Sequence, residues 1–368
     1  MGSQRKRRVI HLDTGPGLRG GQRQLLLLAN GLRQRGHAQL IVCVEGSELE
    51  ARASQEAFAV FSLPAHDPAH AFGILLLRQR LWVTPYDILH SHDGRAQTLA
   101  WLASFGMPVR RVASRRVTFL PGDRWSYRLK YERTCHAIIA VSEYVRQLIM
   151  HSGISESRIV LIPDGIVIPP ELPLPQQRSR LRACWGFSDA DFVVGHLGAF
   201  TREKGQDVAL DAISLLVGRL PQLRLVLAGE GPMRTLPELV KRVGALGDRV
   251  HLCDVVEDVA EFFPALDLFV MPSRAEGLGS SALLAMAYGL PVIASRVGGL
   301  SEVVIEDETG WLVAPDSPRA LADAILIAAS DKARRIQFGS NGRKRVQSFS
   351  VSTMVDRTEA LYERLLSA

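Results

Sequence analysis

Residues 273–295 read SRAEGLGSSALLAMAYGLPVIAS and combine a carboxylate, a glycine-rich turn, a helix of small residues and an apolar strand. The preceding run DLFVMP (267–272) is typical of a buried strand, so the turn is expected just beyond the carboxyl end of a sheet. Unpaired N–H groups at a helix start favour an anion, and glycine lets the backbone approach it closely. Ser280 or Ser281 can cap the helix or touch a ligand, whereas Glu276 suits hydroxyl groups. A plain capped helix with a solvent-facing glutamate is the alternative.

Strand and helix patterns alternate along the whole chain. Five prolines in residues 163–177 interrupt the alternation and predict a linker, because proline blocks both helix and central strand. The pattern predicts two doubly wound α/β domains with parallel sheets, whose ligands bind in a cleft between the carboxyl ends of the strands. Expected strands are 9–12, 40–44, 86–92, 109–114, 137–142, 158–163, 191–198, 223–229, 249–253, 267–272 and 291–295, and expected helices are 22–36, 204–220 and most of the chain from 317 onward.

Charge is unevenly distributed over the 368 residues. Residues 1–170 hold 22 Lys and Arg against 13 Asp and Glu, a net charge of +9, while the remainder holds 22 against 25, or −3. A basic first half suits a phosphate or an anionic lipid, or it is simply a solvated surface. We expect no nucleic-acid partner, because no zinc-finger spacing or aromatic strand motif occurs. The four scattered cysteines, the lack of a signal peptide and the lack of a long apolar run favour a cytoplasmic protein.

Three further motifs follow expected strands of the second half. They are GAFTREKGQD (198–207), AGEGP (228–232) and VGGLSE (297–302). Lys204 lies near the start of a helix, where the positive end of the helix dipole disfavours a cation. A ligand phosphate bound there would make the lysine favourable. An exposed lysine on a loop is the alternative.

Taken in order, these motifs resemble the retaining family 4 glycosyltransferases of the GT-B fold, in which two Rossmann-like domains face each other across a cleft. The matching segments are GAFTREKG (198–205), GEGP (229–232), PSRAEGLG (272–279), AMAYGLPVIAS (285–295), GGLSE (298–302) and TGWLV (309–313). RGGQRQLLLLANGLRQRGH (19–37) looks like the family's first loop and helix. The resemblance implies an acceptor-side domain at 1–168, a linker at 169–178, a donor-binding domain at 179–349 and a last helix, 350–368, that packs back on the first domain.

The resemblance also implies roles for individual residues. Glu276 would contact hydroxyls of the donor sugar, Lys204 would neutralise its diphosphate, and Gly20 and Gly21 would approach its phosphate. The enzyme would lower the barrier to sugar transfer by stabilising the charge that develops on the leaving diphosphate. Further donor-site positions are Ala199, Glu230, Cys253, Gly277, Leu278, Gly279, Ser280 and Leu284.

Three positions depart from the family pattern. The second glutamate of its signature falls at Leu284, the usual phosphate arginine falls at Ala199, and its catalytic histidine falls at Ser114 or Arg115. Arg115 or Arg116 is therefore expected to replace the missing charge, unless Arg115 is an ordinary surface residue. His92 is a candidate for acceptor contact, and His90 is expected to be a satisfied loop histidine.

These observations predict transfer of a sugar, with retention, from a UDP- or GDP-linked donor to a glycan or lipid-linked acceptor, as in lipopolysaccharide or cell-envelope glycan synthesis. We expect no cofactor and no metal, and peripheral contact of the basic domain with the inner face of an anionic membrane. The alternative is a non-catalytic or weakly active relative with the GT-B fold that binds a nucleotide sugar or a partner, motivated by Leu284 and Ala199. An epimerase would need a carboxylate pair that is not evident, and GPGLRGG (15–21) has the wrong spacing for a dehydrogenase.

Overall fold

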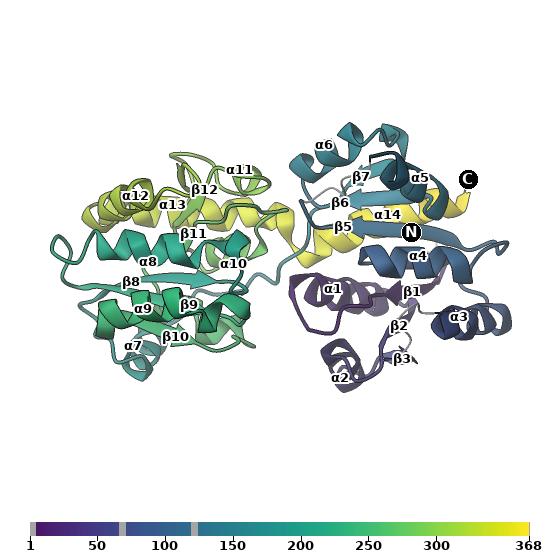
Figure 1. Ribbon diagram of the computed structural model, residues 1–368, viewed down its shortest axis with the longest axis horizontal. Coiled ribbons are helices and arrows are strands. Elements are labelled where there is room, and N and C mark those ends of the chain that lie inside the picture. The colour runs from purple at the N-terminus through teal and green to yellow at the C-terminus, as the bar shows by residue number, and fades with distance from the viewer. Residues whose placement is uncertain (1–4, 66–70, 119–123, 368) are drawn as a thin grey trace. The chain divides into compact units, whose positions relative to one another are not determined.

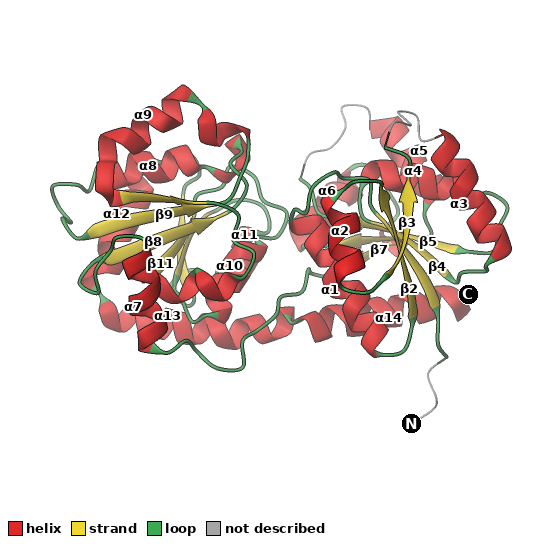
Figure 2. Ribbon diagram, turned by 90° about the horizontal axis from the view of Figure 1, so that it is seen from below, coloured by secondary structure: helices red, strands yellow, loops and turns green. Residues whose placement is uncertain are grey.

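The computed structural model describes residues 5–65, 71–118 and 124–367 of the chain (Figure 1). The chain forms two compact units, of which the first joins Met1–Gly165 with Val351–Ala368 and the second is Ile166–Ser350. Each unit has one parallel sheet with helices on both faces (Figure 2). The α/β class with two parallel sheets is thus confirmed.

The sheet of the first unit has seven strands in the order β3-β2-β1-β4-β5-β6-β7. Its strands are short apolar runs because both faces of a parallel sheet are covered by helices. In β1, Ile10 and Leu12 point into one core while Val9 points into the other. The strands are β1 (Arg8–Leu12), β2 (Ala38–Val44), β3 (Ala59–Leu63), β4 (Ile88–Ser91), β5 (Arg110–Arg115), β6 (Ala137–Ala140) and β7 (Ile159–Leu161).

The last helix of the chain, α14 (Val351–Ser367), belongs to the first unit. Its buried residues Met354, Val355, Leu361 and Tyr362 share a core with Leu28 and Leu32 of α1. The other helices of this unit are α1 (Gly20–Gln34), α2 (Glu48–Gln55), α3 (Ala71–Val83), α4 (Gly94–Ala103), α5 (Arg124–Thr134) and α6 (Glu143–His151).

The sheet of the second unit has six strands in the order β10-β9-β8-β11-β12-β13. They are β8 (Phe192–Leu197), β9 (Leu223–Ala228), β10 (Val250–Cys253), β11 (Leu268–Met271), β12 (Val292–Ser295) and β13 (Gly310–Val313). The helices are α7 (Pro175–Cys184), α8 (Gln206–Ser214), α9 (Pro237–Leu246), α10 (Ser280–Ala287), α11 (Leu300–Val303), α12 (Pro318–Ser330) and α13 (Lys332–Arg345).

Some segments differ from the expectation. Residues 169–178 lie within the second unit, and Pro175 begins α7 because proline is tolerated at the first position of a helix. Helix α8 ends at Ser214, although the apolar spacing that predicted it continues to residue 220. Strand β3 was missed because most of its residues are only half-buried, so it lacks the apolar run of the other strands.

Candidate active site

The motifs of the second half meet at one edge of its sheet. Strands β9, β8, β11 and β12 are neighbours in the parallel sheet, so the loops that follow them emerge side by side at the carboxyl end. These loops carry residues 229–232, 198–205, 272–279 and 296–299. Segments up to 100 positions apart in the sequence therefore build one site.

Lys204 and Glu276 form an ion pair in this site. The Lys204 Nζ atom donates to Glu276 Oε2 at 2.6 Å, and the two side chains are only 25% and 12% exposed. Ser273 Oγ also donates to Glu276 Oε2, at 3.4 Å. The two residues that the sequence singled out separately are thus in direct contact.

The turn after Glu276 is held by the glycines that follow β12. Gly299 N donates to the Glu276 carbonyl at 3.1 Å. A Cβ atom at Gly298, whose φ is +50°, would lie 2.0 Å from that carbonyl oxygen, and one at Gly299 would lie 2.3 Å from the Gly277 carbonyl oxygen. Only glycine fits at these two positions, so the two loops pack backbone to backbone.

The expected serine cap of α10 is wrong. Gly279, with a φ of +103°, is the N-cap residue, and no described side chain caps this helix. Ser280 and Ser281 are the first two residues of α10, where a serine cannot act as the cap. The chain enters α10 through a left-handed backbone conformation, which glycine adopts without strain. The N-cap position is therefore 279, one residue before the serines.

A half-buried arginine that sequence reasoning missed joins two of these loops. Arg274 donates to both carboxylate oxygens of Asp207 at 2.9 Å, to Asp316 at 2.6 Å and to the Arg202 carbonyl at 2.8 Å. Burial alone would raise the pKa of Asp207, but the hydrogen bonds and charge of Arg274 hold this pKa below its usual value. Arg274 therefore fixes the Lys204 loop against the Glu276 loop.

The remaining donor-site candidates lie around this centre in the second unit. Ala199 and Leu284 are half-buried, Glu230 is exposed, Gly277, Leu278 and Gly279 are buried, and Cys253 ends β10. Arg234, also missed from the sequence, donates to the carbonyls of Gly229 at 3.0 Å and Cys253 at 3.1 Å. It ties together the ends of β9 and β10.

Gly20 and Gly21 lie in the first unit, where they form the first turn of α1 and not the loop before it. Apart from the adjacent residues and the backbone of α1 itself, no described atom lies within 4 Å of a Cβ atom built at either position, so the space beside them is open. The loop itself is shaped by the buried Asp13, whose Oδ1 accepts from Gly15 N and from Gln22 Nε2, both at 2.8 Å.

A series of buried hydrogen bonds runs through the first unit and ends near the carboxyl ends of β4 and β5. Gln39 Oε1 lies 2.9 Å from His11 Nε2, and His11 Nδ1 lies 3.0 Å from His92 Nε2. His92 Nδ1 lies 3.2 Å from an Arg116 Nη1, and Arg116 Nε donates to Asp164 at 2.8 Å. Both ring nitrogens of His92 are thus engaged, and the side chain of Arg116 is held from two sides.

Arg116 determines the tautomers of His92 and His11. Because an arginine only donates, His92 Nδ1 must accept, and His92 then carries its proton on Nε2. That proton is donated to His11 Nδ1, so the proton of His11 lies on Nε2 and is donated to Gln39 Oε1. Both histidines are neutral, in agreement with pKa values lowered chiefly by burial.

The other buried groups complete this picture. His90 is satisfied by the Tyr362 hydroxyl at 2.6 Å and by Ser114 Oγ at 2.8 Å, although it lies on β4 and not in a loop. Ring nitrogens of His11, His90 and His92 lie within 4.8 Å of one another, a spacing that suits a metal. Their hydrogen bonds and the adjacent Arg116 fit neutral histidines better, because a guanidinium repels a further cation. Arg115, at the end of β5, is 8% exposed.

Acid is expected to destabilise the first unit through His11. Burial, opposed by the Gln39 hydrogen bond and reinforced by the Arg116 charge, lowers the pKa of His11 to about 4. An unfolded histidine has a pKa of about 6.5. Between pH of about 6.5 and about 4 the unfolded chain therefore binds more protons than the folded chain. The free energy of unfolding falls as the pH falls through this range, by about 3 kcal/mol in total. Urea unfolding as a function of pH measures this. His11→Gln should flatten the slope, and His151→Gln, at an exposed position, should not; equal slopes would contradict the assignment.

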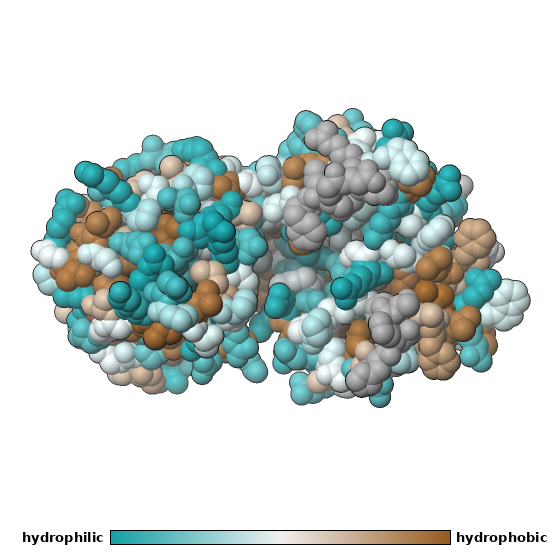
Figure 3. Space-filling model, in the orientation of Figure 1, coloured by the Kyte–Doolittle hydropathy of each residue, from teal (hydrophilic) through white to brown (hydrophobic). Residues whose placement is uncertain are grey.

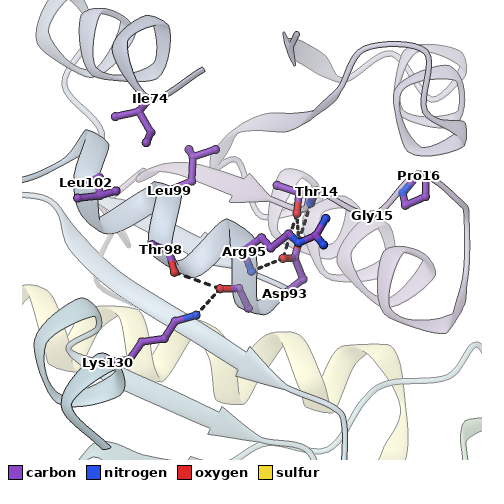
Figure 4. Close-up of a pocket in the computed structure, with 11 residues that line it drawn as sticks. Thr14, Gly15, Pro16, Ile74, Asp93, Arg95, Thr98, Leu99, Leu102 and Lys130 are labelled. Atoms are coloured by element: carbon purple, nitrogen blue, oxygen red, sulfur yellow. Dashed lines mark hydrogen bonds between the residues drawn. The ribbon is translucent and has the colours of Figure 1, made fainter. Parts of the chain in front are cut away.

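A cavity of about 630 Å³ lies in the first unit between α3, α4 and the loop after β1 (Figure 4). Its polar end has Thr14, Asp93, Arg95 and Lys130, and its apolar end has Ile74, Leu99 and Leu102. Asp93 caps α4 by accepting from Arg95 N at 2.7 Å and Ala96 N at 2.9 Å, and it also accepts from Thr14 N at 2.5 Å. Its oxygens are therefore already used within the unit.

Two parallel α/β units, with a lysine, a glutamate and close glycine turns at the strand ends of the second, match the GT-B class of proteins. Residues 18–168 match the family described as Glycosyltransferase Family 4, and residues 191–331 match that described as Glycosyl transferases group 1. The chain belongs to these group 1, family 4 glycosyltransferases, and it is a retaining glycosyltransferase. The family and fold expected from the motifs are confirmed.

Individual relatives support this assignment. A D-inositol 3-phosphate glycosyltransferase of Corynebacterium glutamicum is 30% identical over 329 residues, covering 82% of this chain and 77% of that protein. The lipopolysaccharide core biosynthesis mannosyltransferase LpsB of Rhizobium meliloti is 32% identical over 200 residues, 52% of this chain and 57% of that protein. HepE of Anabaena, solved with UDP and glucose, shares the fold with a TM-score of 0.86 at 23% identity, covering 97% of this chain and 99% of that one. Within the described residues, no helix is long and apolar enough to cross a membrane.

Proposed function

We propose that the second unit binds a nucleotide-diphosphate sugar, UDP- or GDP-linked, and that the enzyme transfers its sugar to a glycan or lipid-linked acceptor. The observation that carries this proposal is the Lys204–Glu276 pair at the strand ends, beside the glycine turn that opens α10. A cation next to a carboxylate and a close backbone turn suit a ligand with both a diphosphate and hydroxyl groups.

The pair explains how the site would receive its donor. A diphosphate would draw the Lys204 ammonium to itself, because two phosphate groups carry more charge than one carboxylate. The Glu276 oxygens, released from Lys204, would then accept hydrogen bonds from sugar hydroxyls. As the bond to the leaving diphosphate breaks, Lys204 stabilises the charge that develops there. Arg274 contributes by keeping both loops in register.

We assign supporting roles to the first unit. Gly20 and Gly21 are proposed to approach the donor phosphate, which the open space beside them supports. Arg115 and Arg116 are proposed to supply the charge that Ala199 lacks. For His92 we now propose a positioning role, because both of its nitrogens are engaged and one of them accepts from Arg116.

The acceptor is proposed to be lipid-linked or a glycan of the cell envelope, including lipopolysaccharide, at the inner face of a membrane. The net charge of +9 on residues 1–170 and the likeness to LpsB support this. The cavity of the first unit, with a polar end that includes Arg95 and Lys130 and an apolar end, offers space for such an acceptor.

Thermal shift with UDP, GDP, ADP and their common sugars tests the donor proposal. One nucleotide sugar is expected to raise the melting temperature, because it binds only the folded chain. Leu284→Glu supplies a carboxylate for the ribose hydroxyls and should tighten binding about tenfold, since a satisfied buried hydroxyl is worth about 1–3 kcal/mol. Val240→Glu, at an exposed position of α9, is the matched control and should change nothing.

A weakly active member of the family is the second candidate, favoured by Leu284 and Ala199 at two positions where the family has polar residues. It predicts no shift with any nucleotide for the natural chain. A shift that appears only in Leu284→Glu would indicate a donor site with weakened binding.

A further inference from the structure

Helix α3 is apolar on two opposite faces. Gly73, Leu77 and Leu81 are buried, four residues apart along one face. Phe72, Leu75 and Trp82, three and seven residues apart, lie on the opposite face and are 58%, 62% and 78% exposed. A surface helix of a globular protein normally has a polar outer face, whereas this one carries three large apolar side chains there, beside the exposed Gln79.

The end of α4 extends this apolar face. Arg78, in the middle of α3, donates to the carbonyls of Ala103 at 3.2 Å and Phe105 at 2.9 Å, which fixes α3 to the C-terminal end of α4. Leu102 and Phe105 are 40% and 65% exposed there. Figure 3 shows hydrophobic side chains gathered over α3 and α4. We call Phe72, Leu75, Trp82, Val83, Leu102 and Phe105 the α3–α4 patch.

The two helices that carry the patch are basic. Helices α3 and α4 contain Arg78, Arg80 and Arg95 and no acidic residue. The cavity beside the patch runs from Ile74 and Leu102 at its apolar end to Arg95, Lys130 and Asp93 at its polar end (Figure 4). Apolar and aromatic side chains next to basic ones match the interface of an anionic lipid bilayer, which has an apolar interior and negative head groups.

We propose that the α3–α4 patch inserts into the interfacial region of an anionic bilayer and so brings the cavity of the first unit to lipid-borne acceptors. Trp82, at the last turn of α3, lies where the amphipathic indole suits the level of the head groups. The link to the acceptor rests on the proposed function, whereas the bilayer contact rests on the patch alone.

Co-sedimentation of the full chain with vesicles tests this proposal. Binding is expected to equimolar phosphatidylcholine and phosphatidylglycerol, to weaken with added salt, and to be much lower for phosphatidylcholine alone. Leu75→Gln/Trp82→Gln should lower the partition coefficient at least about tenfold, because two apolar side chains lose their place in the lipid. Phe105→Ser, at the other end of the patch, should lower it too and serves if the double variant misfolds.

The matched control is Leu215→Gln/Val240→Gln, two side chains of the second unit that are each 55% exposed. It should bind vesicles like the natural chain. Equal binding of the natural chain and both patch variants, or no binding of the natural chain to anionic vesicles, overturns the proposal. The thermal shift with nucleotide sugars separates the two claims. A patch variant that no longer binds vesicles but is still stabilised by the nucleotide sugar supports the docking surface. Vesicle binding by a natural chain that no nucleotide sugar stabilises contradicts only the donor proposal.

Discussion

Lys204→Ala and Glu276→Gln are each expected to lower kcat/KM for sugar transfer by about a hundredfold to a thousandfold, the cost of removing one group that stabilises transition-state charge or orients the reacting sugar. In the proposed donor site, Lys204→Ala removes the contact of the ammonium group with the diphosphate, and Glu276→Gln keeps the shape of the side chain while removing its charge. Release of the nucleoside diphosphate, measured with the donor found by thermal shift, gives both values.

The double variant tells catalysis from structure. If each residue acts on a different part of the donor, the two losses multiply, and if the 2.6 Å contact is only structural, the double variant is no worse than either single one. Lys241→Ala and Glu238→Gln change exposed residues of α9 and should keep full activity. Single variants that retain activity would remove the pair from the mechanism.

Gly298→Ala is expected to destabilise the second unit by about 3 kcal/mol, from overpacking and from a left-handed backbone that alanine disfavours. The new methyl group would meet the Glu276 carbonyl oxygen at 2.0 Å, so the loop that carries Glu276 must move. Activity should therefore fall at temperatures where the chain is still folded. Urea unfolding and the transfer assay measure both effects.

Gly244→Ala provides the control for this substitution. Gly244 lies within α9 with no atom within 4 Å of the added Cβ, so alanine should stabilise the chain by about 1 kcal/mol. If Gly298→Ala unfolds at the same urea concentration as the natural chain and keeps its activity, the close packing of the two loops does not matter for function.

Much of the fold was predictable because strand and helix patterns are local. The apolar runs of β1, β8 and β11 are buried on both faces and are therefore continuous in sequence. Strand β13 was quoted only as the motif TGWLV, because four residues next to a glycine give too short a run to distinguish a strand from a turn.

The candidate site was predictable in its residue types but not in its contacts. Lys204 and Glu276 were found from motif and position, yet their pairing over 72 positions cannot be read from spacing. Arg274 and Arg234 were missed for the same reason, since each joins loops that only the sheet order brings together. His11 lies in an ordinary strand pattern. Its partner His92 directly follows β4, and only the pairing of β1 with β4 brings the two histidines together.

The first unit is discontinuous in sequence, and this has a consequence during synthesis. Residues 351–367 leave the ribosome only after the whole of residues 166–350, so the second unit can fold while the first still lacks α14. Until then Leu28 and Leu32 lack the apolar partners that α14 provides, and His90 lacks the Tyr362 hydroxyl. A chain cut before residue 351 would thus leave an intact second unit attached to an incompletely packed first unit, which chaperones and proteases would recognise.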